Sequence, residues 1–71
     1  MSNLNFLCEI GARIKRFRNE KNMTQIQLAT LCEFEKASMS RIEAGKTNPT
    51  MLTIKKISEA LKVHPSDLLR D

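Results

Sequence analysis

The hydrophobic residues of this chain recur at helical spacing from the start. The first apolar stripe has steps of three, four and three residues, which place its members on one face of an α-helix: Leu7, Ile10, Ile14 and Phe17. This helix is expected to run from about Leu4 to Lys21, and Asn22 suits the left-handed position that follows a helix end. Basic side chains fall mostly on the other faces. The pattern therefore predicts an amphipathic helix that buries one stripe.

A short second helix is predicted to begin after Thr24 and to last to about Cys32. Thr24 and Gln27 have the spacing of a capping box, in which two side chains satisfy N–H groups at the start of a helix. Its expected buried face consists of four residues: Leu28, Ala29, Leu31 and Cys32.

A third helix is predicted from Lys36 to Ala44, after an interruption at residues 33–35. Met39 and Ile42 are its expected core contacts, and Gly45 is the permissive residue that closes it. Its other side chains are short or basic, so the helix gains little from burial. Such a helix is either an ordinary surface helix or one that inserts into a partner.

The last third of the chain predicts two more helices. Thr50 caps the first of them, which ends near Leu61 and has an inward face formed by Ile54, Ile57 and Leu61, with Met51 and Ala60 beside them. His64 is expected to cap a final short helix whose first residue is Pro65. We therefore favour a structural role for His64 over a catalytic one.

The composition agrees with a small all-α fold. The chain has 71 residues, enough for a single domain over 1–71, with two Gly, two Pro, three Phe and no Trp or Tyr. These residues suit helices better than a β-sandwich. No apolar run approaches the ~20 residues of a membrane span, and no basic start precedes an apolar stretch. We expect a soluble protein of the cytoplasm.

The charge of the chain favours an anionic partner. Twelve Lys and Arg stand against eight Asp and Glu, giving a net charge of +4. Nucleic acid is the first expectation and an anionic membrane surface the second. The basic first helix needs its apolar stripe for the core, which argues against the membrane.

Few residues suggest catalysis or metal binding. Cys8 and Cys32 form no disulfide framework, and both are expected to be small buried hydrophobes. Together with His64 they have unrelated spacings that suit no zinc site. The chain has one His, no catalytic Cys–His or Ser–His spacing and no Gly-rich phosphate loop. We expect no enzymatic activity, no metal, no cofactor and no small-molecule ligand.

Two short helices joined by three residues, the second polar and basic, indicate a helix-turn-helix at about residues 24–44. The DNA major groove is about 12 Å wide and admits an α-helix whose N-terminal side chains meet base edges. Residues 36–44 are therefore the predicted recognition helix. Its small residues allow close approach, and its Lys and Arg supply hydrogen-bond donors.

Two motifs make this interpretation specific. Residues 24–29 have the pattern Thr-Gln-x-x-Leu-Ala, and residues 40–45 have the pattern Ser-Arg-Ile-Glu-x-Gly. With Asn48-Pro49-Thr50 and residues 60–63, they resemble the lambda-repressor/Cro-like (Xre-type) helix-turn-helix family over roughly Ile10 to Leu69. The resemblance implies an all-α, compact five-helix DNA-binding domain.

The resemblance also implies which side chains touch DNA: Gln25, Lys36, Ala37, Ser38, Ser40, Arg41, Lys46 and Thr47. Gln25, Lys46 and Thr47 correspond to contacts with backbone phosphate, which fix register without reading sequence. Lys36 and Arg41 are the candidates for base readout. Of the remaining three, the serine at position 40 is expected to contact either phosphate or a base.

Arg18 and Glu43 correspond to a structural ion pair between the first and third helices of the family. Two other positions depart from the family pattern. Glu33 stands where Gly is usual, so we expect left-handed backbone there. Glu35 replaces the usual Ser or Thr cap of the recognition helix. A glutamate caps poorly, and it would either repel phosphate or accept a hydrogen bond from cytosine N4.

The expected function is sequence-specific binding of double-stranded DNA by a transcriptional regulator. One helix reads few base pairs, so we expect a homodimer on a two-fold operator, with Leu52 and Leu69 as candidate interface residues. A chain of this size resembles controller proteins of restriction–modification systems and small phage regulators, and an antitoxin or the excised DNA-binding half of a repressor fits almost as well. The alternative is a protein-interaction adaptor, which predicts an apolar or acidic third-helix face; Lys36 and Arg41 argue against it.

Overall fold

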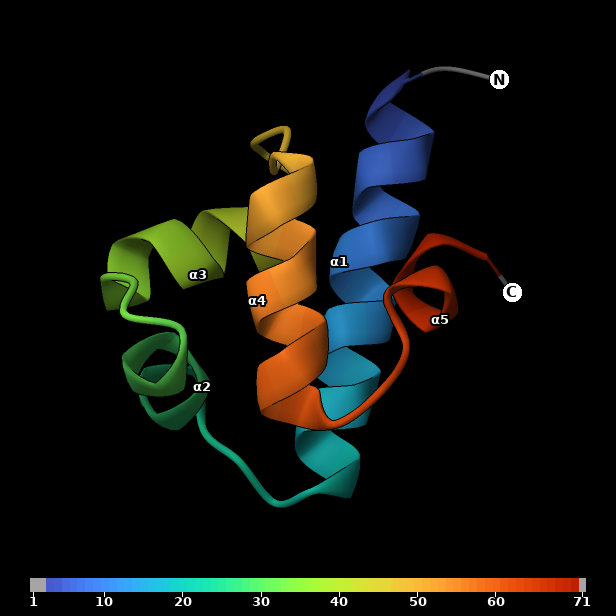
Figure 1. The fold of residues 1–71 in the computed structure, drawn as a ribbon. Helices are drawn as coiled ribbons and strands as arrows, with labels where there is room; N and C mark the ends of the chain where they lie inside the picture. Colours follow the sequence, from blue (N-terminus) through green and yellow to red (C-terminus); the bar gives the residue numbers. More distant parts are fainter. Residues whose placement is uncertain (1–2, 71) are drawn as a thin grey trace.

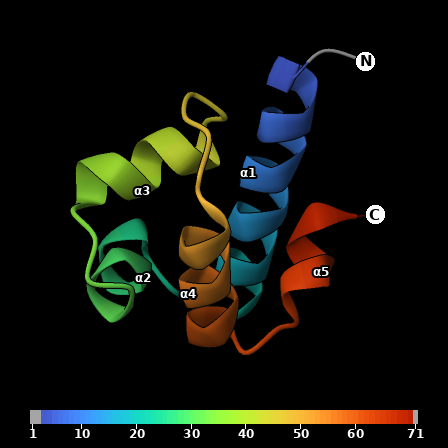
Figure 2. The ribbon, with the colours of Figure 1, turned by 45° about the horizontal axis from the view of Figure 1, so that its top comes forward.

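The structure, a computed structural model, describes residues 3–70. Its helices are α1 (Asn3–Glu20), α2 (Gln25–Leu31), α3 (Lys36–Glu43), α4 (Met51–Leu61) and α5 (Pro65–Leu69). The all-α prediction is confirmed, since the described part of the chain has no strand. Helix α1 packs against α3, α4 and α5, and α2 packs against α3 and α4. In two views, α2 and α3 lie on one side of α4, and α5 lies on the other (Figures 1 and 2).

Three of the helices begin with the caps that the sequence predicts. Thr24 Oγ1 accepts from the Gln27 N–H at 3.1 Å, and Gln27 Oε1 accepts from the Thr24 N–H at 2.8 Å. Thr50 Oγ1 accepts from the N–H of residue 53 at 3.1 Å. His64 Nδ1 accepts from the N–H of residue 66 at 3.2 Å, while the Asp67 carboxylate accepts from the His64 N–H at 3.0 Å. The structural role expected of His64 is thus confirmed.

A single apolar core lies between the helices. Its fully buried members come from every helix: Ile14, Leu28, Met39, Ile54, Ile57, Leu61 and Leu68. Cys32 is also buried, and burial raises the pKa of its thiol, with the positive charge of Lys56 acting in the opposite direction. The buried position expected of Cys32 is therefore confirmed.

Three side chains that were expected inside the core lie outside it. Leu31 is 59% exposed. Viewed down the axis of α2, Leu31 lies on one side of Leu28, whereas the buried Ala29 and Cys32 lie on the other side. Met51 is 70% exposed because it is the first residue of α4 and projects beyond the core. Cys8 is exposed because it precedes the buried Ile10 by two residues, which places it on another face of α1.

Helix α5 buries its two leucines unequally. We predicted that α5 is too short to bury both of them, and Leu68 is fully buried whereas Leu69 is only half-buried against the same core. The physical reason is the close packing of α5 on α1 and α4, where Arg13 Nη1 donates to the Leu68 carbonyl oxygen at 3.4 Å. Leu52, by contrast, is 63% exposed.

Candidate nucleic-acid interface

The turn between α2 and α3 has a defined hydrogen-bond geometry. Glu33 adopts the predicted left-handed conformation, with φ at 60°. Its N–H donates to the Thr30 carbonyl at 3.1 Å, and the Phe34 N–H donates to the Ala29 carbonyl at 2.8 Å. These two bonds form a Schellman motif, and Phe34 packs against the core. The direction in which α3 leaves the turn is therefore fixed by backbone bonds and by one partly buried ring.

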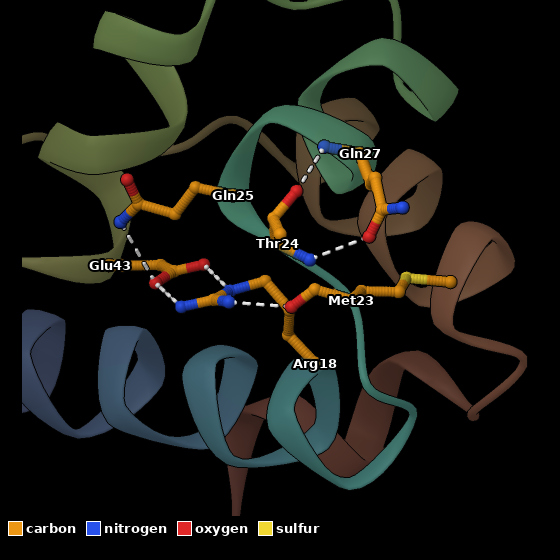
Figure 3. A network of polar contacts seen from close by, with 6 residues as sticks. All are labelled: Arg18, Met23, Thr24, Gln25, Gln27 and Glu43. Carbon is orange, nitrogen blue, oxygen red and sulfur yellow. Dashed lines mark hydrogen bonds and ion pairs between the residues drawn. The ribbon is translucent and has the colours of Figure 1, made fainter.

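The C-terminal end of α3 is fixed by a buried ion pair. Arg18 of α1 donates to Glu43 of α3 through Nε at 2.8 Å and through Nη2 at 3.1 Å (Figure 3). Arg18 Nη1 also donates to the Met23 carbonyl at 2.7 Å. Both charged side chains are less than a tenth exposed. The pair thus joins α1, the segment before α2, and α3.

Gln25 is the fourth member of this network. Its Nε2 donates to Glu43 Oε1 at 3.1 Å, so the side chain leans from the start of α2 toward the end of α3 (Figure 3). The sequence predicted a phosphate contact for Gln25 and did not predict this partner. An amide group carries two N–H donors, and Glu43 uses one of them.

Helix α3 has one buried and one open face. Met39 and Ile42 are buried in the core, whereas Lys36, Ala37 and Arg41 are exposed. The two serines of the helix, at positions 38 and 40, are half-buried between these faces. The open face therefore combines two cations with small side chains, which suits close approach to an anionic polymer.

The loop after α3 continues this face. Lys46 is exposed, and Thr47 is half-buried. A shallow pocket of about 190 Å³ separates the loop from α3, and it is lined by Ser38, Arg41, Ile42, Thr47, Asn48, Pro49, Thr50 and Thr53. Three predicted site residues from two segments thus meet at one pocket. Asn48 of the loop and Thr53 of α4 line the same pocket and were not among the predicted site residues.

Two glycines allow the C-terminal end of α3 to pack closely against α1. A Cβ atom at Gly11 would overlap the Glu43 carbonyl oxygen and lie 2.6 Å from the Ile42 carbonyl oxygen. Gly45 has φ at 72°, and a Cβ there would lie 2.7 Å from Cys8 Sγ. Both positions therefore require glycine, one for close helix packing and the other also for its backbone conformation.

Within residues 3–70, no helix has both the length and the apolar character to cross a membrane. The same residues contain no group of three or more His, Cys, Asp or Glu side chains placed to hold a metal ion.

Comparisons with known proteins agree with this geometry. The family model described as helix-turn-helix (HTH_3) matches residues 14–68. The chain is 42% identical over 60 residues to the control protein C.BamHI of Bacillus amyloliquefaciens, which covers 83% of this chain and 74% of that protein. It is 38% identical over 61 residues to the HTH-type transcriptional regulator SinR of Bacillus subtilis (strain 168), covering 84% of this chain and 55% of that protein.

The structural comparison gives the same family of folds. The restriction-modification controller protein C.AhdI from Aeromonas hydrophila superimposes with a TM-score of 0.85 at 29% sequence identity. The superposition covers 87% of this chain and 94% of that chain.

Proposed function

The chain belongs to the helix-turn-helix family HTH_3 and is a DNA-binding transcriptional regulator, and we propose that it acts as a homodimer on a two-fold operator. The observation that carries the proposal is the open face of α3. Lys36, Ala37 and Arg41 are exposed on it, while the opposite face is buried and Glu43 anchors the end of the helix. A helix held in this way can enter the major groove without rearrangement of its core.

The exposed side chains have different roles in this proposal. Lys36 and Arg41 reach base edges, where Arg can bond guanine O6 and N7 in a bidentate manner. Ala37 and Ser38 are small, so the helix backbone comes close to the bases. The phosphate contacts come from Lys46, Thr47 and the second N–H of the Gln25 amide, with Ser40 on phosphate or base. The relatives come from bacteria and a bacterial phage, in which DNA lies in the cytoplasm, and this supports the cytoplasm as the proposed site of action.

Association of two copies extends readout over two half-sites. Two-fold dimers of this architecture place their recognition helices about 34 Å apart, which is one turn of DNA. Leu52 is the candidate contact that the structure leaves exposed, and Met51 next to it is exposed as well. Leu52 and the half-buried Leu69 are the proposed interface residues, and Met51 extends the apolar surface beside Leu52.

The adaptor alternative has less support. It requires an apolar or acidic surface on α3, but the exposed residues of the helix itself include Lys36 and Arg41 and no large apolar side chain. Control proteins and repressors both occur among the relatives, so the biological setting we propose is a restriction–modification system or a repressor circuit.

The experiment that tests the proposal is selection of bound duplexes from a random DNA pool by the full chain. We expect an enriched palindromic motif whose half-sites are centred about ten base pairs apart. Enrichment of no sequence would overturn sequence-specific binding. Enrichment of one half-site without its symmetric copy would overturn the dimer and leave DNA binding intact.

A further inference from the structure

The start of α3 differs from the starts of α2, α4 and α5. Those three helices have a side-chain cap, whereas Glu35, at the N-cap position of α3, makes no side-chain cap hydrogen bond. Glu35 is exposed, and no ion pair to it is found among residues 3–70. Within the described part of the chain, its carboxylate therefore neither caps the helix nor forms an ion pair.

The position of Glu35 places that carboxylate at the leading end of the recognition helix. The N-terminal end of α3 lies at the edge of the molecule away from α1 and α5 (Figures 1 and 2). The next residues are the exposed Lys36 and Ala37. Side chains at this end of a recognition helix are those that meet base edges when the helix lies in the major groove.

We propose that Glu35 is a specificity-determining residue that accepts a hydrogen bond from the N4 amino group of a cytosine in each half-site. The inference rests on the proposed function, because it requires α3 to lie in the major groove. It adds an acidic base contact to the basic and small residues that the family resemblance predicts.

The chemistry of the base edges selects cytosine. A carboxylate only accepts hydrogen bonds, so it needs a donor in the groove. Cytosine presents the N4 donor, whereas guanine presents two acceptors and thymine presents an acceptor and a methyl group. Adenine has an N6 donor, but its N7 acceptor lies beside it and repels the carboxylate. Glu35 therefore favours cytosine and disfavours the other three bases.

The negative charge of Glu35 also increases the difference in affinity between the cognate sequence and other sequences. On a sequence without the cytosine, the Glu35 carboxylate loses water and receives no donor in return, while nearby phosphates repel it. On the cognate sequence, the hydrogen bond offsets this cost. Glu33 lies two residues before Glu35 and is exposed in the turn. It therefore has the same charge as Glu35 but does not lie at the N-terminal end of α3.

The test compares E35Q with E33Q by selection from a random duplex pool. Both variants remove one negative charge from an exposed side chain, and circular dichroism checks that each remains folded. A glutamine at position 35 can donate to adenine N7 and accept from N6, so E35Q should change one position per half-site from cytosine to adenine. E33Q should retain the wild-type motif and only increase affinity for all sequences.

A modified base tests the same contact without changing the fold. N4-methylcytosine still pairs with guanine, but its methyl group replaces the N4 hydrogen that faces the major groove. At the assigned position it should weaken wild-type binding by on the order of tenfold. The variant E35A should bind the methylated and unmethylated duplexes equally.

The outcomes separate this inference from the proposed function. If the wild-type protein enriches a motif and E35Q enriches the same motif at every position, Glu35 reads no base, although sequence-specific binding stands. A base change common to E35Q and E33Q would also overturn the inference, because it would reflect charge alone. If the wild-type protein enriches nothing, the proposed function itself fails.

Discussion

Arg41 and Lys46 are both exposed cations, yet DNA offers each of them a different set of acceptors. In the proposed complex, Arg41 on α3 reaches base edges, where a planar guanidinium can form paired hydrogen bonds. In the same proposed complex, Lys46 in the loop after α3 contacts backbone phosphates. The two residues should therefore affect affinity, sequence preference and salt dependence in different ways.

Arg41→Ala should cost about 1–3 kcal/mol of binding free energy at the selected operator and relax the preference at one base position. Lys46→Ala should weaken binding to all sequences alike and reduce the slope of log K against log salt by about one. Fluorescence anisotropy over a salt series measures both effects. Lys15→Ala, an exposed cation on α1, is the matched control. An Arg41→Ala protein with unchanged affinity and preference would place α3 outside the groove.

At the scale of elements, the Arg18–Glu43 pair connects α1 to the end of the recognition helix. Removal of either residue leaves a charge that is largely buried. Arg18→Ala and Glu43→Ala should each lower the free energy of unfolding by about 3 kcal/mol, and the double variant should lose much less than the sum. Urea denaturation followed by circular dichroism measures the double-mutant cycle.

A second ion pair within α1 serves as the control for this cycle. Glu9 and Arg13 approach to 3.7 Å, and the Glu9 side chain is about half exposed. Glu9→Ala should therefore cost less than about 1 kcal/mol. A coupling energy of zero between Arg18 and Glu43 would show that the buried pair contributes no more to stability than the half-exposed Glu9–Arg13 pair.

Gly11 provides a test of close packing between α1 and α3. Alanine is intrinsically favoured over glycine in a helix by about 1 kcal/mol, but a Cβ here would meet two carbonyl oxygens of α3. Gly11→Ala should therefore lower the free energy of unfolding by about 1–3 kcal/mol. The neighbouring Ala12→Gly variant measures propensity alone, since Ala12 is exposed. A stabilised Gly11→Ala protein would contradict the contact.

These elements show where sequence reasoning succeeds. The capping box at Thr24, the His64 cap and the left-handed position at Asn22 depend on neighbours within a few residues, and the structure contains all of them. The left-handed position at Glu33 is implied by the family resemblance, and the structure contains it as well. Lys62 is a further left-handed position that no Gly or Asn signalled. Local backbone chemistry is therefore mostly predictable from local sequence.

Long-range packing is less predictable for a physical reason. Periodicity identifies the apolar stripe of a helix but not the width of the partner surface, which is why the exposed Leu31 and Met51 were expected inside the core. The same holds at the candidate site. The bond from Gln25 to Glu43 and the close approach at Gly11 depend on where α3 lies in space.

At the scale of the whole molecule, the proposed dimer depends on a small apolar surface at the start of α4. Leu52→Glu should reduce the affinity for a duplex with two half-sites to about that for a single half-site, because a charge at the interface opposes association. Sedimentation measures the dimer, and gel shifts on one-site and two-site duplexes measure cooperativity. Circular dichroism should show an unchanged fold, since the side chain is exposed.

Leu31→Glu is the matched control for this variant. Leu31 is 59% exposed against 63% for Leu52, and it lies on α2 rather than at the start of α4. We expect Leu31→Glu to retain the dimer and its cooperativity. If Leu52→Glu retains them as well, the interface lies elsewhere, and the half-exposed Phe6 in the first turns of α1 becomes the next candidate.

The separation of the two faces of α3 has a consequence for how proteins of this shape diverge. Met39, Ile42 and Glu43 hold the helix in the fold, whereas Lys36, Ala37 and Arg41 contact solvent. Substitutions at exposed positions usually change stability by less than about 0.5 kcal/mol. A duplicated gene can therefore accumulate new residues on the open face without passing through an unfolded ancestor. Paralogues in one cell can acquire non-overlapping operators by a few such steps.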